Sequence, residues 1–395
     1  MDILKGVRIL DFTRVLSGPF ATMILGDMGA EIIKVERPLS GDDSRKYGPF
    51  INGESAFFMS INRNKKSVTV DLKNPDGKKI IQDLIKKSDV LVENFRPGVM
   101  DGLEFGYEKA TILNPRLIYA AISGFGRTGP LSTLAAYDGV VQAMSGIMSI
   151  TGEKGGKPVR VGSSIGDIIS GIYCALGVMA ALYEREHTGK GSLIDIAMLD
   201  SLASILENAI ARYQTTGSDP IPLGNAHPSI FPFETFPTAS SEEIMIAVGN
   251  DAIWGQFCEA IGRKELAVDA LLLTNPLRGE NHDYMYRELC DALSKRSADE
   301  WYKLLSDEGV PCSLINRISQ VINNPQLVSR NMIQTVEHQK AGTITVTGNP
   351  IKKGGGEEYT YKPAPILGAD TEATLESVLG ISKDSIKQLR RDGVI

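Results

Sequence analysis

The chain has 395 residues, of which 42% are hydrophobic and 23% are charged, proportions that are typical of a soluble globular protein and not of a disordered or fibrous one. Its length favours two domains, or one domain with a large elaboration. The net charge of −6 argues against non-specific nucleic-acid binding, which needs a basic surface to displace counterions.

Cysteine and histidine usage gives no sign of a metal site. The four cysteines and four histidines are scattered without the paired spacings of a disulfide framework, a zinc ribbon or a zinc protease. The first residues lead directly into an apolar run without the features of a secretory signal. The nearest candidate for a membrane span, residues 172–182, contains Gly177 and falls short of the roughly 20 residues that are needed. We therefore expect a cytoplasmic protein with reduced thiols, no metal and no membrane partner.

Short apolar runs alternate with helical patterns over the first 200 residues. A strand at 7–12, a helix at about 20–28 and a strand at 30–36 come first, and further strands are expected at 67–72, 89–94, 117–123 and 192–198. This alternation is typical of βαβ units in a largely parallel sheet that is covered on both faces. The predicted fold class is α/β.

The pattern changes after residue 200, where a long amphipathic helix over about 200–215 ends at Gly217. A stretch rich in proline and glycine follows at 218–237 and is interpreted as a linker. Beyond it we expect a smaller α/β unit, a β-rich stretch at 342–348 and a last helix near 383–391. The predicted division is a large domain over 1–200, a helix and linker over 201–237, a small domain over 238–323, and a segment over 324–395 that returns to the large domain.

Two glycine-rich motifs suggest other functions. Residues 124–129 have the spacing G-x-G-x-x-G after a predicted strand, but Pro130 follows where a helix should already run. We therefore expect a flexible loop there, with neither nicotinamide nor flavin. Residues 162–166 have the spacing G-x-S-x-G of a hydrolase nucleophile, Ser164. Its partner could be His227, His282 or His338, because catalytic triads are assembled in space.

Asp167 follows this second motif at the start of a predicted helix over about 168–187. An aspartate there could be only a helix cap. The small residues before it leave the carboxylate accessible, and helix-terminal N–H groups can hold an anion. With an ordinary pKa of about 3.9, the carboxylate would be ionised at neutral pH and could act as a nucleophile without a separate base.

Several motifs together resemble the class III CoA-transferases. They are GVRILDFT at 6–13, SGP at 17–19, GAEIIKVE at 29–36, VENFRPG at 92–98, GD at 166–167 and GVP at 309–311. The resemblance implies two interlocked, ring-like chains in a homodimer. It also implies a large Rossmann-like domain built from both ends of each chain. Asp167 would be the nucleophile, and it would carry CoA from an acyl-CoA donor to a carboxylic acid through an aspartyl-CoA thioester.

The same resemblance implies the CoA site. It places Val15 and Leu16 near the adenine, places the Tyr137–Asp138 pair near the thioester, and assigns the phosphates and the CoA arm to Arg37, Leu72, Lys73, Asn94, Phe95 and Arg96. Arginine and lysine are the usual phosphate donors, although each could be only a surface charge. Formyl-CoA transferase has lysines where this chain has Ser123 and Ala135. It also has a glycine-rich loop where this chain has residues 223–230.

The acid substrates follow from closer resemblances within the family. Residues 136–138, 158–162 and 224–228 look most like enzymes that transfer CoA from acetyl-CoA to oxalate, with succinyl-CoA-dependent dicarboxylate transferases close behind. A small dicarboxylate acceptor is therefore expected, oxalate first. The related α-methylacyl-CoA racemases remain an alternative, but they carry histidine where this chain has Tyr137, and an ordinary tyrosine is a poor base near neutrality.

Overall fold

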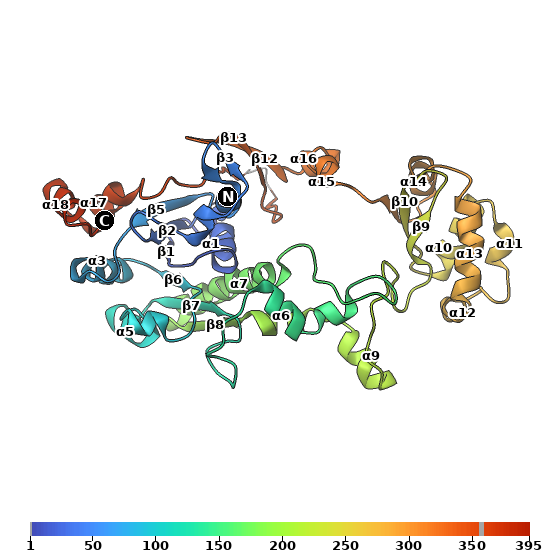
Figure 1. The fold of residues 1–395 in the computed structure, drawn as a ribbon, viewed down its shortest axis with the longest axis horizontal. Coiled ribbons are helices and arrows are strands. Elements are labelled where there is room, and N and C mark those ends of the chain that lie inside the picture. Colours follow the sequence, from blue (N-terminus) through green and yellow to red (C-terminus); the bar gives the residue numbers. More distant parts are fainter. Residues whose placement is uncertain (1, 355–358) are drawn as a thin grey trace. The chain divides into compact units, whose positions relative to one another are not determined.

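The computed structural model describes residues 2–354 and 359–395, and the chain forms two compact units (Figure 1). Unit 1 consists of Met1–Met148, Arg160–Thr215 and Gln326–Ile395, and unit 2 consists of Ser149–Val159 and Thr216–Pro325. Unit 1 is therefore built from both ends of the chain, and unit 2 comes from its middle.

Unit 1 contains a six-stranded parallel sheet in the order β5-β2-β1-β6-β7-β8. Its strands are β1 (Arg8–Asp11), β2 (Glu31–Glu36), β5 (Lys65–Thr69), β6 (Val90–Glu93), β7 (Ile118–Ser123) and β8 (Leu193–Ala197). The sequence predicts all six strands. The inner ones are buried on both faces and read as apolar runs, whereas the edge strand β8 is exposed at alternate positions. The α/β class with a parallel sheet is confirmed.

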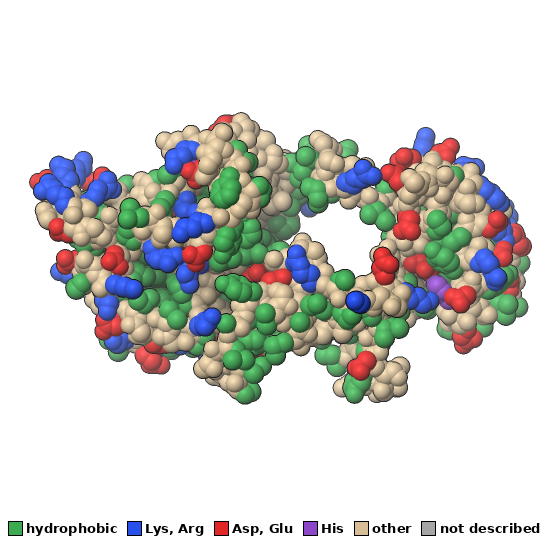
Figure 2. All heavy atoms as spheres, in the orientation of Figure 1, with side chains coloured by type: hydrophobic (Ala, Val, Ile, Leu, Met, Phe, Trp, Pro, Cys, Tyr) green, Lys and Arg blue, Asp and Glu red, His purple; other side chains and the backbone are tan. Residues whose placement is uncertain are grey.

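Helices cover both faces of this sheet. On one face α1 (Ser17–Asp27) packs against α7 (Ile165–Thr188), which also contacts β7 and β8. The other face shares one core with α3 (Pro75–Lys86), α5 (Tyr107–Leu113), α17 (Thr371–Leu379) and α18 (Lys383–Arg391) (Figure 1). The C-terminal segment is held to β5, because Asp370 accepts the Ser67 N–H at 2.9 Å. α18 buries Ile386, and its Lys and Arg side chains gather on the surface (Figure 2).

α3 shows how the sequence specifies such a helix. The Asn74 side chain caps its first turn by accepting the Asp76 N–H, and Pro75 occupies a first-turn position where no N–H is needed. Apolar residues then recur with the spacing of one helical face, and all four are buried: Ile80, Ile81, Leu84 and Ile85. Burial of this face holds α3 on the sheet.

Unit 2 contains a three-stranded antiparallel sheet in the order β11-β10-β9. Its larger elements are β9 (Phe233–Pro237), β10 (Glu243–Ala247), α10 (Asp251–Ala260), α13 (His282–Leu293), α14 (Ala298–Asp307) and β11 (Cys312–Leu314). The interpretation of 218–237 as linker alone is wrong at its end. Residues 233–237 form β9, where the buried Phe236 pairs with Ile244 of β10.

Several shorter elements complete the chain. They are β3 (Phe50–Ile51), β4 (Glu54–Ser55), α2 (Ala56–Ile61), α4 (Val99–Gly102), α6 (Asp138–Met144), α8 (Met198–Ser204), α9 (Ala209–Thr216), α11 (Lys264–Ala267), α12 (Asn275–Glu280), α15 (Ile318–Val321), α16 (Pro325–Ser329), β12 (Ile333–His338) and β13 (Gly342–Thr347). The predicted β-rich stretch at 342–348 is the second strand of the β12–β13 hairpin.

The single helix predicted over 200–215 is wrong, because the chain forms α8 and α9 with a break at 205–208. Glu207 lies in the left-handed region at φ 53° inside the break. α8 buries Leu202, whereas α9 buries none of its residues. Because α9 has no buried face, packing does not extend α8 through the break.

The expectation that no segment is long and apolar enough to span a membrane also fails. α7 meets that criterion by length and composition. In the sequence, glycines and Asp167 interrupt this apolar run, but in the structure the helix continues through them. Within unit 1, α7 packs against α1, β7 and β8, and a core helix can have the same composition.

The strand order determines where a ligand can bind. β1 lies between β2 and β6, so the chain leaving β1 and the chain leaving β6 turn to opposite sides of the sheet. In open parallel sheets the carboxyl ends of such strands form a crevice that binds ligands. Residues 12–17 and 94–97 follow these two strand ends.

Candidate active site

The turn after β1 is fixed to the turn after β6 by side chain-to-backbone hydrogen bonds. The Arg14 N–H donates to Asn94 Oδ1 at 2.8 Å, and Asn94 Nδ2 donates to the Arg14 carbonyl at 2.8 Å. Val15 has φ 65°, which is strained for a β-branched residue. Such strain persists only where the surroundings enforce it, and it is common at functional sites.

Buried charged residues beneath these turns hold the backbone in this conformation. Lys34 Nζ donates to the Thr13 carbonyl at 2.7 Å and lies 2.9 Å from Asp42, whose other oxygen accepts the Val15 N–H at 3.2 Å. Burial opposes ionisation of Asp42, but Lys34 outweighs it and holds the pKa of Asp42 below its ordinary value. Asp11 is paired in the same way with the buried Lys65 at 3.1 Å.

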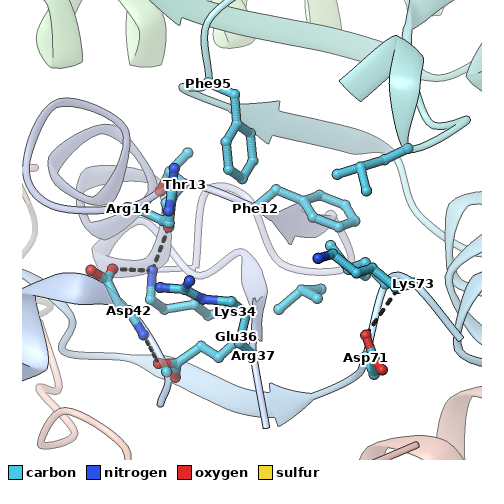
Figure 3. A pocket seen from close by; sticks show the side chains of 14 residues that line it. Phe12, Thr13, Arg14, Lys34, Glu36, Arg37, Asp42, Asp71, Lys73 and Phe95 are labelled. Carbon is cyan, nitrogen blue, oxygen red and sulfur yellow. Dashed lines mark hydrogen bonds and ion pairs between the residues drawn. The ribbon is translucent and has the colours of Figure 1, made fainter. Parts of the chain in front are cut away.

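A first pocket of about 190 Å³ lies beside these turns (Figure 3). It is lined by four of the predicted CoA-binding residues, Arg37, Leu72, Lys73 and Phe95. Arg37 is exposed and pairs with Asp43 at 2.6 Å. Lys73 is also exposed, and its recorded bond to Asp71 uses the backbone N–H, so its ammonium group is available. Two cations thus border a largely apolar cavity, an arrangement that suits a nucleotide with phosphates.

A second pocket, of about 230 Å³, contains Asp167. Its lining includes Phe95 again and five further predicted residues, Val15, Leu16, Asn94, Arg96 and Tyr137. Asp138, which the resemblance also places near the thioester, is buried and does not line this pocket. Arg14 and Phe95 line both pockets, and the Arg14 guanidinium lies 4.6 Å from the centre of the Phe95 ring. The two pockets therefore adjoin. Val15 and Leu16, which the resemblance placed near the adenine, line the pocket of Asp167.

Asp167 is the third residue of α7 and is half-buried. Burial, and then the nearby Asp138 carboxylate, raise the pKa of Asp167 to about 7, while a hydrogen bond from Ser17 opposes the rise. The expectation of full ionisation at neutral pH is therefore corrected. Burial and a like-charged neighbour 29 positions earlier in the chain are not visible in the motif around Asp167.

Residues 162–166, with the G-x-S-x-G spacing, form the approach to α7. Ser164 is its N-cap residue, and its side chain makes no capping hydrogen bond. Among the described residues, no recorded hydrogen bond joins Ser164 to a histidine. His282 is paired with Glu234 at 2.7 Å, and His338 Nδ1 accepts the Ala341 N–H at 3.0 Å. The structure thus shows no assembled serine triad within 2–354 and 359–395.

The loop at 124–129 leaves the carboxyl end of β7, as expected, and Gly124 lines the pocket of Asp167. The Arg127 N–H donates to Asp195 at 3.0 Å, and the Arg127 side chain lies 3.7 Å from the buried Glu93. No regular helix follows before α6. The loop thus forms part of the wall and lacks the strand-turn-helix geometry of a dinucleotide site.

Three residues of the site were not predicted individually, although the first two lie within or next to the quoted N-terminal motifs. Arg14 joins the two pockets, Ser17 lies in the pocket of Asp167 and lowers the pKa of its carboxyl group, and Asp43 forms ion pairs with both Arg14 and Arg37. Their positions depend on how the turn folds back on α1, which no spacing reveals. Among the described residues, no group of three or more His, Cys, Asp and Glu could hold a metal ion.

Known proteins with similar sequences include enzymes named as CoA-transferases. The profile of CoA-transferase family III matches residues 4–371. The acetyl-CoA:oxalate CoA-transferase of Acetobacter aceti is 43% identical over 92% of each chain. The succinyl-CoA:glutarate CoA-transferase of Mus musculus is 40% identical over 100% of this chain and 91% of its own. A crystal structure of a CAIB/BAIF family protein from Brucella suis has a TM-score of 0.84 and 34% identity, covering 95% of this chain and 99% of its own.

The raised pKa of Asp167 predicts a pH-dependent effect of Asp167→Asn on stability. Between pH 3.8 and about 7 the unfolded chain releases a proton that the folded chain still holds, so wild-type stability falls as the pH rises through this range. The asparagine does not titrate. The increase in the free energy of unfolding that Asp167→Asn causes relative to wild type should be absent below pH 4, grow towards pH 7 and then stay constant. It should reach at most about 4 kcal/mol.

Urea unfolding of both proteins from pH 4 to pH 8 measures this difference. Asp200→Asn, at an exposed position of α8, is the control and should show no comparable growth. A difference between Asp167→Asn and wild type that does not change with pH would contradict the raised pKa.

Proposed function

The chain belongs to CoA-transferase family III, and on that premise we propose that it moves CoA from a donor such as acetyl-CoA or succinyl-CoA to a small dicarboxylic acid, oxalate first. Asp167 is the nucleophile of this proposal. The observation that carries it is the junction of the two pockets. Arg14 and Phe95 join a cavity bordered by cations to a cavity that is lined by the Asp167 carboxylate.

Each half of the reaction passes through a mixed anhydride between Asp167 and one of the two acids. The carboxylate attacks the donor thioester carbonyl, the C–S bond breaks, and a mixed anhydride and CoA thiolate form. The thiolate attacks the Asp167 carbonyl and releases the donor acid, which leaves an aspartyl-CoA thioester. The acceptor carboxylate then displaces the thiolate, which attacks the acceptor carbonyl and frees Asp167. Covalent catalysis of this kind divides one difficult exchange into easier steps.

The chain's own residues would bind CoA and orient the nucleophile. Arg37 and Lys73 would bind the phosphates, and Phe95 would carry the CoA arm to the second pocket. Ser17 lines the same pocket as Asp167 and lowers its pKa against the effect of burial, and the Ser17 hydroxyl would aim one carboxylate oxygen at the thioester. A carboxylate of higher pKa is a stronger nucleophile once ionised, so the environment of Asp167 favours attack near neutral pH.

The choice of oxalate rests on similarity to the named relatives. One relative is named for oxalate and another for glutarate, so both acids belong in the test. A hydrolase that uses Ser164 is less well supported, because no histidine within 2–354 and 359–395 is recorded as its hydrogen-bond partner. A racemase is also less well supported, because this chain has Tyr137 where the racemases carry histidine.

We also propose that two copies of the chain form a homodimer in the cytoplasm. α7 carries large apolar side chains that unit 1 leaves exposed, including Leu176 at 60% and Tyr183 at 73%. Further exposed apolar residues lie over the loop before α6 and on α6 itself, including Leu134, Val140 and Met144 (Figure 2). Exposed apolar surface of this extent favours a protein partner. The four cysteines are unpaired, as is usual in a reducing compartment.

An acyl-CoA exchange assay read by mass spectrometry tests the activity. The wild-type chain, given acetyl-CoA or succinyl-CoA, should form a new acyl-CoA with oxalate, or with another acid from a panel of formate, glutarate, malate, itaconate and carnitine. Asp167→Ala should lower this exchange by at least about 1,000-fold, because it removes the covalent route. CoA binding should persist. Release of free CoA without exchange would instead indicate hydrolysis through Ser164.

Light scattering of the purified chain tests the homodimer. The mass should be about twice the 42.8 kDa of one chain, and Leu176→Arg should shift it towards the monomer by placing a charge in an apolar contact. Glu184→Arg, at another exposed position of α7, is the matched control for adding a cation. A wild-type chain of monomer mass at micromolar concentration would contradict the dimer.

A further inference from the structure

We propose that Asp138 and Gln142 of α6 form a hydrogen-bond clasp that positions the segment 161–166 and thereby the catalytic carboxylate of Asp167. The proposal rests on the proposed function, in which Asp167 is the nucleophile. It makes Asp138 and Gln142 positioning residues that act through Asp167, and it requires neither to touch CoA.

The clasp holds both ends of the segment that leads into α7. Asp138 Oδ1 accepts the Gly166 N–H at 2.8 Å, and Gln142 Oε1 accepts the Val161 N–H at 2.8 Å. Gln142 Nε2 donates to Asp138 Oδ2 at 2.7 Å and joins the two side chains. One buried unit therefore fixes the residue directly before Asp167 and the residue six positions before it.

Because this unit is buried, each of its polar groups needs a hydrogen-bond partner. Gln142 is fully buried and Asp138 is 7% exposed, so a buried polar group that lost its partner would be costly. The orientation of the Gln142 amide follows from its partners, because only its oxygen can accept the Val161 N–H and only its nitrogen can donate to the carboxylate. The hydrogen bonds thus run in one direction, from two backbone N–H groups towards Asp138.

Packing around Gly166 leaves little freedom for another arrangement. A Cβ at position 166 would lie 2.9 Å from Val141 and 3.1 Å from Asp138 Oδ1. The first turn of α7 is thus pressed against α6 at the point where the Asp138 carboxylate accepts its N–H. The nearest recorded cation, Arg160, lies 3.9 Å from Asp138 Oδ2 and is 56% exposed, so it is not part of the buried unit.

Reversing the polarity of the clasp tests the proposal. In Asp138→Asn the new amide nitrogen faces the donating nitrogen of Gln142, and turning either amide leaves another N–H unpaired. The double variant combines Asp138→Asn with Gln142→Glu. Its introduced asparagine can accept the Gly166 N–H and donate to the introduced glutamate, which also accepts the Val161 N–H. All three hydrogen bonds are then restored, and the negative charge lies at position 142 instead of position 138.

We expect Asp138→Asn to lower kcat for CoA exchange by about 10- to 100-fold, the range that a small misplacement of a reacting group causes. If Asp138→Asn lowers kcat roughly 100-fold, kcat of the double variant should be at least about tenfold higher than that of Asp138→Asn. If the loss is smaller, the double variant should recover most of the wild-type kcat. KM for acyl-CoA should change by less than about threefold, because other residues form the Arg37–Lys73 pocket. Asp200→Asn, on the exposed side of α8, should leave kcat unchanged.

Three outcomes overturn the clasp while leaving the transferase proposal intact: a double variant no more active than Asp138→Asn, an Asp138→Asn variant with wild-type kcat, or a KM that rises as kcat falls. Hydrogen exchange of the wild-type chain gives a test without substitutions. The Val161 and Gly166 amides should be protected, and exchange at loop rates would also overturn the clasp. A wild-type chain that transfers no CoA at all would overturn the proposed function itself.

Discussion

The site depends on the adjacency of β1 and β6 in a parallel sheet. The chain leaves these two neighbouring strands towards opposite sides, and the residues after each strand line the crevice that this opens. The paired hydrogen bonds between Arg14 and Asn94 close the crevice at its base. Lys34 and Asp42 hold the turn beneath Val15 although both are almost fully buried. Removing either partner would leave an uncompensated buried charge, which is far more costly than the pair itself.

α7 brings the reactive carboxylate to this crevice. Its first turn lies against α6, while its length packs on α1 and the last two strands of the sheet. The small residues before Asp167 permit the close approach, and burial beside Asp138 raises the pKa of Asp167 to about 7. The same packing therefore determines both the position of the nucleophile and the pH range in which it is ionised.

The sequence predicts the inner strands of the sheet because buried parallel strands leave apolar runs, and it predicts the edge strands because strands and helices alternate along the chain. It predicts Asp167 because small residues and a helix start surround it. Other features depend on distant contacts. The break after Ser204 reflects the lack of a buried face in α9, and β9 lies inside a proline-rich stretch. The joining role of Arg14 and the influence of Asp138 on Asp167 depend on residues that meet only when the chain folds. No local pattern contains that information.

Covalent attachment of CoA to Asp167 can be measured by peptide mass spectrometry of the chain after incubation with acetyl-CoA or succinyl-CoA and no acceptor acid. The peptide that contains Asp167 should carry a CoA thioester, which hydroxylamine removes and which Asp167→Asn cannot form. Exchange of CoA between acids without any such adduct, or with an adduct on Ser164 instead, would contradict covalent attachment to Asp167.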